Sequence, residues 1–100
     1  MNSYGKKDTT IKVAYGEKFI ITLETVSTAG YLWRYDIEDT TTITLSEEEL
    51  LIHTTDLGAS TYTQFTFQSL KKGDTHITME YLRPWEESPE EQIRFSIQVT

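Results

Sequence analysis

Few residues of this chain carry the side chains that catalysis or metal binding requires. Its 100 residues include no cysteine and only two histidines, His53 and His76, neither at a spacing that forms a ligand set or a nucleophile and base pair. His76 falls on the polar side of a predicted strand, where we expect an exposed side chain, whereas His53 fits either the surface or a sheet edge. The five glycines stand singly and build no phosphate-binding loop. The sequence therefore predicts no catalytic residue, no metal site and no cofactor.

Acidic residues form a short run at Glu86, Glu87, Glu90 and Glu91. Carboxylates can chelate a hard cation, but no Asp/Asn-Gly turn framework surrounds these four, so a solvated surface is the favoured interpretation. Over the whole chain, 9 Lys and Arg against 16 Asp and Glu give a net charge of −7. Because this charge repels phosphate-rich and anionic surfaces, we expect neither a nucleic acid nor a membrane as partner.

The most distinctive residues are Arg83, Pro84 and Trp85, which directly follow a predicted strand. Pro84 fixes its own φ and biases Arg83 toward an extended conformation, so Trp85 stands on a stiff stem. Two interpretations are open at this point. Trp85 either folds back to cap one end of the fold, or it is a rigid aromatic anchor for a partner, the residue type most enriched at binding hot spots.

Two further loop segments consist of small, weakly polar residues. The first is Val26-Ser27-Thr28-Ala29-Gly30, in which Gly30 can supply the positive φ of a sharp reversal. The second is Leu57-Gly58-Ala59-Ser60-Thr61. In a β-sandwich with Greek-key connections, the loops that lead into the third, fifth and seventh strands lie at one end. Together with the connection that carries Trp85, these loops are therefore predicted to form one ridge.

The elements that position these loops are predicted by alternation, in which every second residue is apolar. Turn signals separate the strands at intervals of about 8–12 residues, and weaker strands are expected at 9–14 and 41–45. We expect one all-β domain over residues 1–100, a sandwich of about seven or eight antiparallel strands, with Trp33 in its core. The inward-facing sets are Phe19, Ile21 and Leu23; Tyr31, Trp33 and Tyr35; Thr63, Phe65 and Phe67; Ile77, Met79 and Tyr81; and Ile93, Phe95, Ile97 and Val99.

The segment that begins at Ser46 is compatible with two structures. Ser46-Glu47-Glu48-Glu49 has the pattern of a capping box ahead of three apolar residues, which favours one helical turn. Leu50, Ile52 and Thr54 also alternate with other residues as a strand does.

Taken in order, these motifs resemble the chagasin family of proteinaceous cysteine-peptidase inhibitors. The first family loop reads Asn-Pro-Thr-Thr-Gly followed by an aromatic residue, and Val26, Ser27 and Ala29 depart from it. The second reads Gly-x-Gly-Gly, from which Ser60 and Thr61 depart. The resemblance spans nearly the whole chain and is carried by Thr28-Ala29-Gly30-Tyr31-Leu32-Trp33, Leu57-Gly58-Ala59, Gly73-Asp74-Thr75-His76 and Tyr81-Leu82-Arg83-Pro84-Trp85.

The resemblance implies an immunoglobulin-like β-sandwich that reversibly inhibits papain-like (cathepsin-like) cysteine peptidases and is not itself an enzyme. Three loops would wedge into the target's cleft and cover its catalytic Cys and His. The departures bear on affinity and target range, because lost proline and glycine residues change preorganisation. The implied binding residues are Val26, Ser27, Thr28, Ala29, Gly30 and Tyr31 in the central loop; Leu57, Gly58, Ala59, Ser60 and Thr61 in the second; and Arg83, Pro84 and Trp85 in the third.

An immunoglobulin-like adhesion or ligand-binding module would use the same loop end and is the alternative function. Residues 1–7 lack the apolar core of a signal peptide, and no run of about 18 apolar residues occurs. The absence of cysteine suits a reducing compartment. We therefore expect a soluble monomer in the cytoplasm, with a vesicular or lysosomal location as the alternative.

Overall fold

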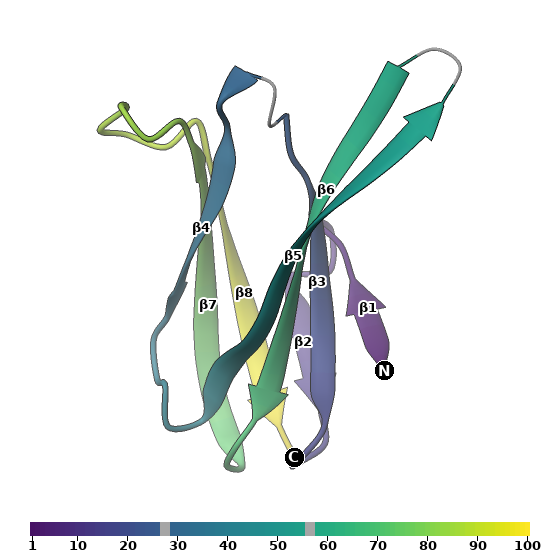
Figure 1. Cartoon of the computed structure of the whole chain (residues 1–100). Coiled ribbons are helices and arrows are strands. Elements are labelled where there is room, and N and C mark those ends of the chain that lie inside the picture. The colour runs from purple at the N-terminus through teal and green to yellow at the C-terminus, as the bar shows by residue number, and fades with distance from the viewer. Residues whose placement is uncertain (27–28, 56–57) are drawn as a thin grey trace.

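The computed structural model describes residues 1–26, 29–55 and 58–100, except for the side chains of 52–60. This part of the chain is all β, and it contains no apolar helix of the length that a bilayer crossing needs. The segment from Ser46 to Glu49 belongs to a strand, so the helical turn considered for it is wrong. The strands in Figure 1 are β1 (Asn2–Tyr4), β2 (Thr10–Val13), β3 (Lys18–Glu24), β4 (Leu32–Ile37), β5 (Ile43–Thr55), β6 (Gly58–Ser69), β7 (Gly73–Leu82) and β8 (Glu91–Val99).

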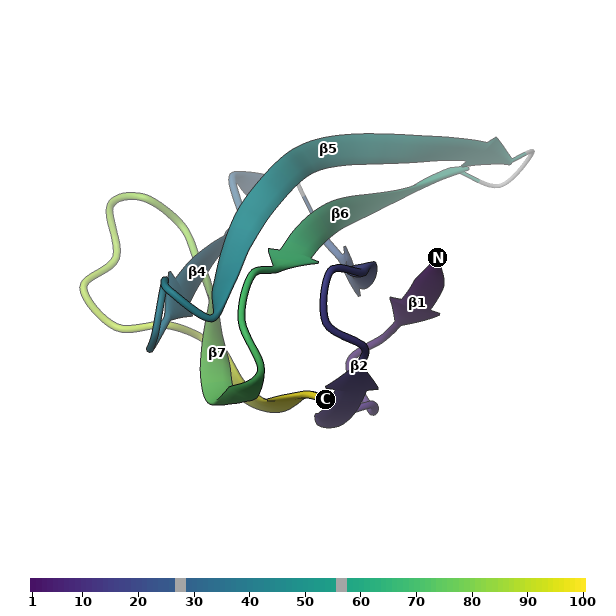
Figure 2. The ribbon, with the colours of Figure 1, turned by 90° about the horizontal axis from the view of Figure 1, so that it is seen from below.

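The strands form two sheets, as the prediction of a sandwich requires. One sheet has the order β1-β3-β6-β5 and the other β2-β8-β7-β4. Figure 2 shows the two layers from below, with β5 and β6 in one and β4 and β7 in the other. Sequence neighbours such as β3 and β4 therefore lie in different sheets, and the connection between them crosses one end of the sandwich.

The N-terminal strands differ from the expected antiparallel arrangement. β1 pairs in parallel with β3, and β2 pairs in parallel with β8. Between them the chain turns at Gly5, whose N–H donates to the Asp8 carboxylate at 2.8 Å, and passes from one sheet to the other. The segment thus supplies one edge strand to each sheet. Each of these edge strands runs parallel to the strand beside it. The sequence analysis did not predict β1 at all.

The core lies where the alternation predicts it. Phe19, Phe65, Phe67 and Phe95 are fully buried, and the rings of Phe19 and Phe67 stack with centroids 5.4 Å apart. Four phenylalanines, which each bury about 150–250 Å² when packed, account for much of the apolar area that holds a chain of this length together.

Trp33 is 6% exposed and lies in the core, as predicted. Its indole Nε1 donates to the main-chain oxygen of Glu24 at 3.0 Å, so this one side chain joins β4 in one sheet to the end of β3 in the other. Tyr35, predicted on the same inward face, is 37% exposed because β4 is an edge strand, and its ring meets Phe65 and Phe67 edge-on at the open side of the sandwich.

β5 contains an irregularity that explains why its sequence was ambiguous. Leu45 pairs with Phe67 and Glu47 with Thr66, so Ser46 is an extra residue in the register with β6. Such a bulge resets the alternation of inward and outward residues, which interrupts the period-two pattern in the sequence. Glutamates follow the bulge on this outer strand, and charge on an edge strand discourages pairing with another chain.

Replacing a fully buried ring should test the core directly. We expect Phe65→Ala to lower the free energy of unfolding by about 3–5 kcal/mol, because the change removes buried apolar surface and leaves a cavity. Urea unfolding measures the difference. Leu70→Ala is the control, since Leu70 is 44% exposed and its change should stay within about 0.5 kcal/mol. Equal losses for the two variants would contradict this description of the core.

Candidate functional site

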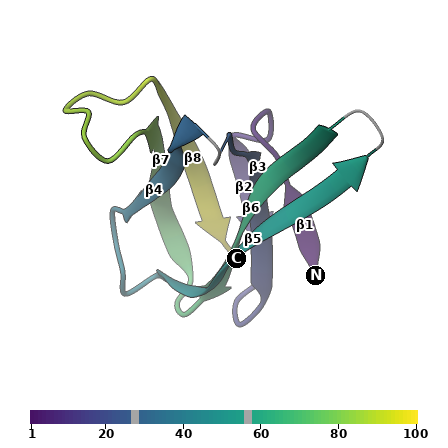
Figure 3. The same cartoon turned by 45° about the horizontal axis from the view of Figure 1, so that its top comes forward.

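Three connections lie at the same end of the sandwich, which we call the apical end (Figure 1). They are loop 1, residues 25–31 between β3 and β4; the β5–β6 hairpin; and loop 3, residues 83–90 between β7 and β8. Figure 3 shows loop 3 and the hairpin on opposite sides of this end. The ridge expected from Greek-key topology therefore exists, while the binding role of its individual residues stays a prediction. Ser27, Thr28 and Leu57 lie outside the described residues.

Loop 1 is fixed to both sheets at its start. The Thr25 N–H donates to the Thr61 main-chain oxygen at 2.8 Å, and the hydroxyls of Thr25 and Thr63 are 2.8 Å apart. One residue later, the Val26 N–H donates to the Tyr81 hydroxyl at 2.8 Å. These bonds tie the loop to β6 in one sheet and to β7 in the other.

Two residues near the end of loop 1 bind the same main-chain oxygen at its start. The N–H groups of Ala29 and Tyr31 both donate to the main-chain oxygen of Val26, at 3.2 and 3.3 Å. Val26 is 50% exposed and Ala29 is also exposed, so these two small side chains face solvent beside the hydrogen bonds to the Val26 oxygen. Gly30 follows with φ of +87°, the left-handed conformation for which a glycine was expected here.

The second predicted loop is instead largely a strand. The backbone from Gly58 to Thr61 continues β6 and pairs with 52–55 of β5, so the expected five-residue loop is wrong for four of its positions. Small and β-branched residues are compatible with a pleated strand as well as with a narrow loop, and the pairing partner decides between them. Because β6 pairs with β3 only as far as Tyr62, this part is a two-stranded arm beyond the sheet.

Loop 3 is held by its own acidic residues. Glu86 Oε1 accepts hydrogen bonds from Arg83 Nε at 2.8 Å and from the Arg83 N–H at 3.2 Å, and the Glu86 N–H donates to the Arg83 oxygen at 2.9 Å. The hydrogen bond from the guanidinium holds the pKa of Glu86 below its ordinary value, and the same bond raises the pKa of Arg83. At the far end, the Glu90 N–H donates to the Tyr81 oxygen at 2.7 Å.

The sequence favours a solvated surface for the acidic run. In the structure, however, most of its carboxylates contact other side chains. Glu86 binds Arg83 and Glu91 forms an ion pair with Lys6, while Glu90 lies close enough to Tyr31 to help raise the pKa of its hydroxyl. Only Glu87 stays exposed without a hydrogen bond or ion pair among the described residues. The described residues also contain no group of carboxylates and histidines placed to hold a metal ion.

Trp85 is 69% exposed, so it does not cap the core, and the anchor interpretation fits its position better. Its indole edge lies over Gly30 of loop 1, where an added Cβ would be 2.7 Å from Trp85 Cη2. The sequence suggested Gly30 only for its φ, and no signal in the sequence indicated this contact. Gly30 therefore serves two purposes, the reversal of loop 1 and the close approach of loop 3.

A stack of aromatic and cationic groups continues from this contact into the sheet. The Arg83 guanidinium lies 5.5 Å from the Trp85 ring and 5.1 Å from the Tyr31 ring, both within cation–π range. Tyr31 stacks in turn on Tyr81, with centroids 4.6 Å apart and an interplanar angle of 10°. Partial burial in this stack, followed by the hydrogen bond with Glu90, raises the pKa of the Tyr31 hydroxyl.

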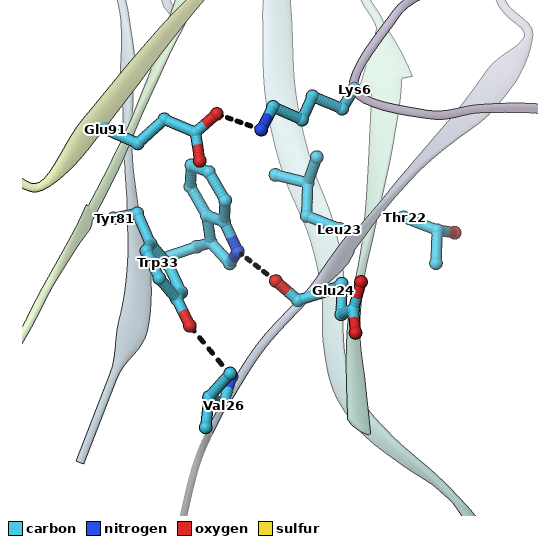
Figure 4. Close-up of a pocket in the computed structure, with 8 residues that line it drawn as sticks. All are labelled: Lys6, Thr22, Leu23, Glu24, Val26, Trp33, Tyr81 and Glu91. Carbon is cyan, nitrogen blue, oxygen red and sulfur yellow. Dashed lines mark hydrogen bonds and ion pairs between the residues drawn. The ribbon is translucent and has the colours of Figure 1, made fainter. Parts of the chain in front are cut away.

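Figure 4 shows the concavity below loop 1, where the supporting side chains meet. The Tyr81 ring lies beside Trp33, with centroids 4.7 Å apart, and its hydroxyl reaches Val26. The ion pair of Lys6 and Glu91 crosses the same concavity. Its lining includes the side chains of Trp33 and Tyr81, which bind the main chain of Glu24 and Val26, so we interpret it as a support of the apical end.

Of the two histidines, only His76 has a described side chain. His76 is half-buried rather than exposed as expected, with its ring 34% accessible and Nδ1 3.3 Å from Glu38 Oε2. Glu38 also pairs with Arg94, whose terminal nitrogen lies 3.0 Å from the same oxygen. The His53 side chain lies outside the described residues. The strand that carries His76 pairs with β4 and β8, and His76 Nδ1 has no hydrogen-bond partner among the described residues.

Comparison with known proteins agrees with this geometry. A model of the family described as chagasin family peptidase inhibitor I42 matches residues 12–99. A search of curated proteins gives no significant sequence match.

Similar solved structures share the fold at low sequence identity. The cysteine protease inhibitor EhICP2 from Entamoeba histolytica is 23% identical, with a TM-score of 0.87 over 99% of this chain and 95% of that one. Amebosin is 22% identical, with a TM-score of 0.77 over 99% and 97%. PbICP-C, in a structure of its complex with falcipain-2, is 22% identical, with a TM-score of 0.62 over 98% and 88%.

Two glycines allow a matched test of the contact between loops 1 and 3. Gly30 and Gly16 have nearly the same φ, +87° and +85°, but an added Cβ at Gly16 meets nothing within 4 Å. Both Gly→Ala changes should cost about 1–2 kcal/mol for the left-handed backbone. Gly30→Ala should cost more and should also shift the fluorescence of Trp85, which must move aside. Equal unfolding free energies and unchanged emission in both variants would contradict the contact.

The ion pair of loop 3 predicts a pH response. The folded pKa of Glu86 lies below its ordinary value of 4.5, so its stabilising contribution is present above that value and is lost as the pH falls through the lower folded one. We expect Trp85 emission to stay constant from neutral pH to about pH 5 and to change only in more acidic solution. Circular dichroism must show that the sandwich persists. The same transition in Glu86→Gln would refute the assignment.

Proposed function

The chain belongs to the chagasin family of peptidase inhibitors, and on that premise we propose that its apical end docks into the active-site cleft of papain-like cysteine peptidases. The observation that carries the proposal is that loop 1, the hairpin and loop 3 all lie at one end of the sandwich, with loops 1 and 3 in direct contact. A neighbour of the same fold, PbICP-C, has been solved in complex with falcipain-2, which supports a peptidase as the partner.

Loop 1 is suited to fill a catalytic cleft without being cleaved. A papain-like peptidase attacks a peptide carbonyl only when the bond lies extended in the cleft, with its carbon near the thiolate and its oxygen in the oxyanion hole. In loop 1, Val26 is instead held next to Ala29 and Tyr31, because the N–H groups of both residues donate to the Val26 oxygen. These hydrogen bonds oppose the extended geometry that cleavage requires. Loop 1 would therefore cover the peptidase's catalytic thiolate without forming an acyl-enzyme.

Loop 3 supplies the largest apolar contact. Trp85 exposes 69% of its surface while its edge is seated on Gly30. Burying the exposed part of an indole, at about 25 cal/mol per Å², gives about 3 kcal/mol before ordering costs. Because the ring already contacts loop 1, binding costs little further side-chain entropy, which is the general advantage of a preorganised anchor. We place Trp85 on the primed side of the cleft.

The hairpin arm offers main-chain groups on the non-primed side. Residues 58–61 continue β6 past its last pair with β3. The Thr61 oxygen still accepts the Thr25 N–H, and this edge of the arm at residues 58–60 has no sheet partner among the described strands. Extended segments bind peptidase clefts by adding main-chain hydrogen bonds, and an unpaired edge can do this without a particular side chain. Docking of this kind forms no covalent bond and needs no cofactor, so inhibition is reversible.

The anchor can be tested by truncation. We expect Trp85→Ala to weaken inhibition of papain by about 10- to 100-fold, since loss of a buried tryptophan costs roughly 2 kcal/mol or more and each 1.4 kcal/mol is about tenfold. Tyr15→Ala is the control, because Tyr15 is 59% exposed in the turn between β2 and β3 and belongs to none of the three apical connections. Inhibition constants from steady-state kinetics measure both.

Full papain activity in the presence of excess folded wild-type protein would exclude this peptidase as a target. Inhibition that persists unchanged in Trp85→Ala would instead remove loop 3 from the interface and leave loop 1 and the hairpin to account for it.

A further inference from the structure

We propose that Glu86 is a positioning residue: its carboxylate holds the Arg83 side chain between Tyr31 and Trp85 and so joins loops 1 and 3 into one docking unit before a partner binds. The proposal rests on the proposed function only for the statement that this unit meets a peptidase. The joining of the loops is a property of the free protein and can be measured without any partner.

The first step is the closed ring around Trp85. Three hydrogen bonds link Arg83 and Glu86: the carboxylate accepts from Nε at 2.8 Å and from the N–H at 3.2 Å, and the Glu86 N–H donates to the Arg83 oxygen at 2.9 Å. The two residues enclose Pro84 and Trp85, and Pro84 has a fixed φ. Trp85 therefore stands at the tip of a four-residue turn that is bonded at its base through both main chain and side chain.

The second step is the direction in which the turn holds its arginine. With Nε bound to Glu86, the guanidinium lies 5.1 Å from the Tyr31 ring and 5.5 Å from the Trp85 ring. Tyr31 belongs to loop 1 and is stacked on Tyr81 of β7. A cation between two aromatic rings attracts both, so the arginine connects the tip of loop 3 to loop 1 and, through Tyr31, to the sheet.

The third step is the environment of the ion pair. The side chains of Arg83 and Glu86 are only 35% and 24% exposed, so solvent screens their attraction less than that of a fully exposed pair. Arginine is a long side chain with many rotamers, and a charge-assisted bond to Nε selects one of them. The Arg83 side chain is thus engaged within the protein, while its role as a peptidase-binding residue, which the resemblance implies, stays a prediction.

Glu87 provides a matched comparison. It is the next residue, carries the same charge and is exposed, with no hydrogen bond or ion pair among the described residues. Glu86→Gln and Glu87→Gln change the net charge equally, so any long-range electrostatic effect on association cancels between them. A difference between the two variants therefore reports the contact with Arg83.

The first experiment uses the free protein labelled with 5-fluorotryptophan, whose ¹⁹F spectrum has one signal each for Trp33 and Trp85. We expect Glu86→Gln to shift or broaden the Trp85 signal and Glu87→Gln to leave it in place. The Trp33 signal should stay constant in both, because Trp33 lies in the core and reports the intact fold. Identical Trp85 signals in the two variants would overturn the proposal.

The second experiment measures inhibition of papain in a double-mutant cycle. Glu86→Gln should weaken inhibition about 3- to 10-fold and Glu87→Gln less than twofold. In an Arg83→Met background, the same Glu86→Gln change should add less than twofold, because Glu86 acts through the arginine. An undiminished effect in that background would mean that Glu86 touches the peptidase itself, which would also overturn the proposal.

The two experiments separate this proposal from the proposed function. If the wild-type protein does not inhibit papain while the Trp85 signal still responds to Glu86→Gln alone, the positioning role stands and papain is excluded as the target. If inhibition is strong and the Trp85 signal ignores Glu86, the function stands and the positioning role is wrong.

Discussion

The apical end depends on one residue, Tyr81 of β7. Its hydroxyl accepts the N–H of Val26, its ring stacks on Tyr31 and lies beside Trp33, and its main-chain oxygen accepts the N–H of Glu90. Loops 1 and 3 are thus both bound to the same residue of β7. A phenol can do this because it combines a broad apolar face with a polar tip at a fixed distance from the backbone. The two loops are therefore positioned by a residue of the sheet that lies beneath them.

The strands and the core could be predicted from alternation because burial on one face imposes a period of two. Phe65, Phe67 and Phe95 are buried where the pattern places them. Two features had no such signal. β1 is only three residues long and pairs in parallel, so it depends on a partner distant in sequence. The bulge at Ser46 replaces alternation by an irregular step, and the glutamates around it then have the same pattern as a helix cap.

The candidate site was predicted in part. Arg83 and Trp85 stand out by residue type beside a proline, and Gly30 by its place in a turn. The contacts among them are tertiary: the seat of Trp85 on Gly30 and the stack of Arg83 on Tyr31 join residues more than fifty positions apart. No local pattern encodes such a contact. The pairing of Glu86 with Arg83 is local, at a separation of three, but in a sequence it cannot be told from an ordinary acidic surface.

The length of the arm formed by the ends of β5 and β6 is independent of the pairing between β3 and β6. Residues 58–61 lie beyond the last pair of β6 with β3 and continue to pair with β5. Adding one pair of residues to each strand would lengthen the arm while every existing side chain kept its face, because faces repeat every two residues. Inhibitors of different reach can therefore be built on one scaffold, each fitted to a deeper or shallower cleft, with no change to the sandwich.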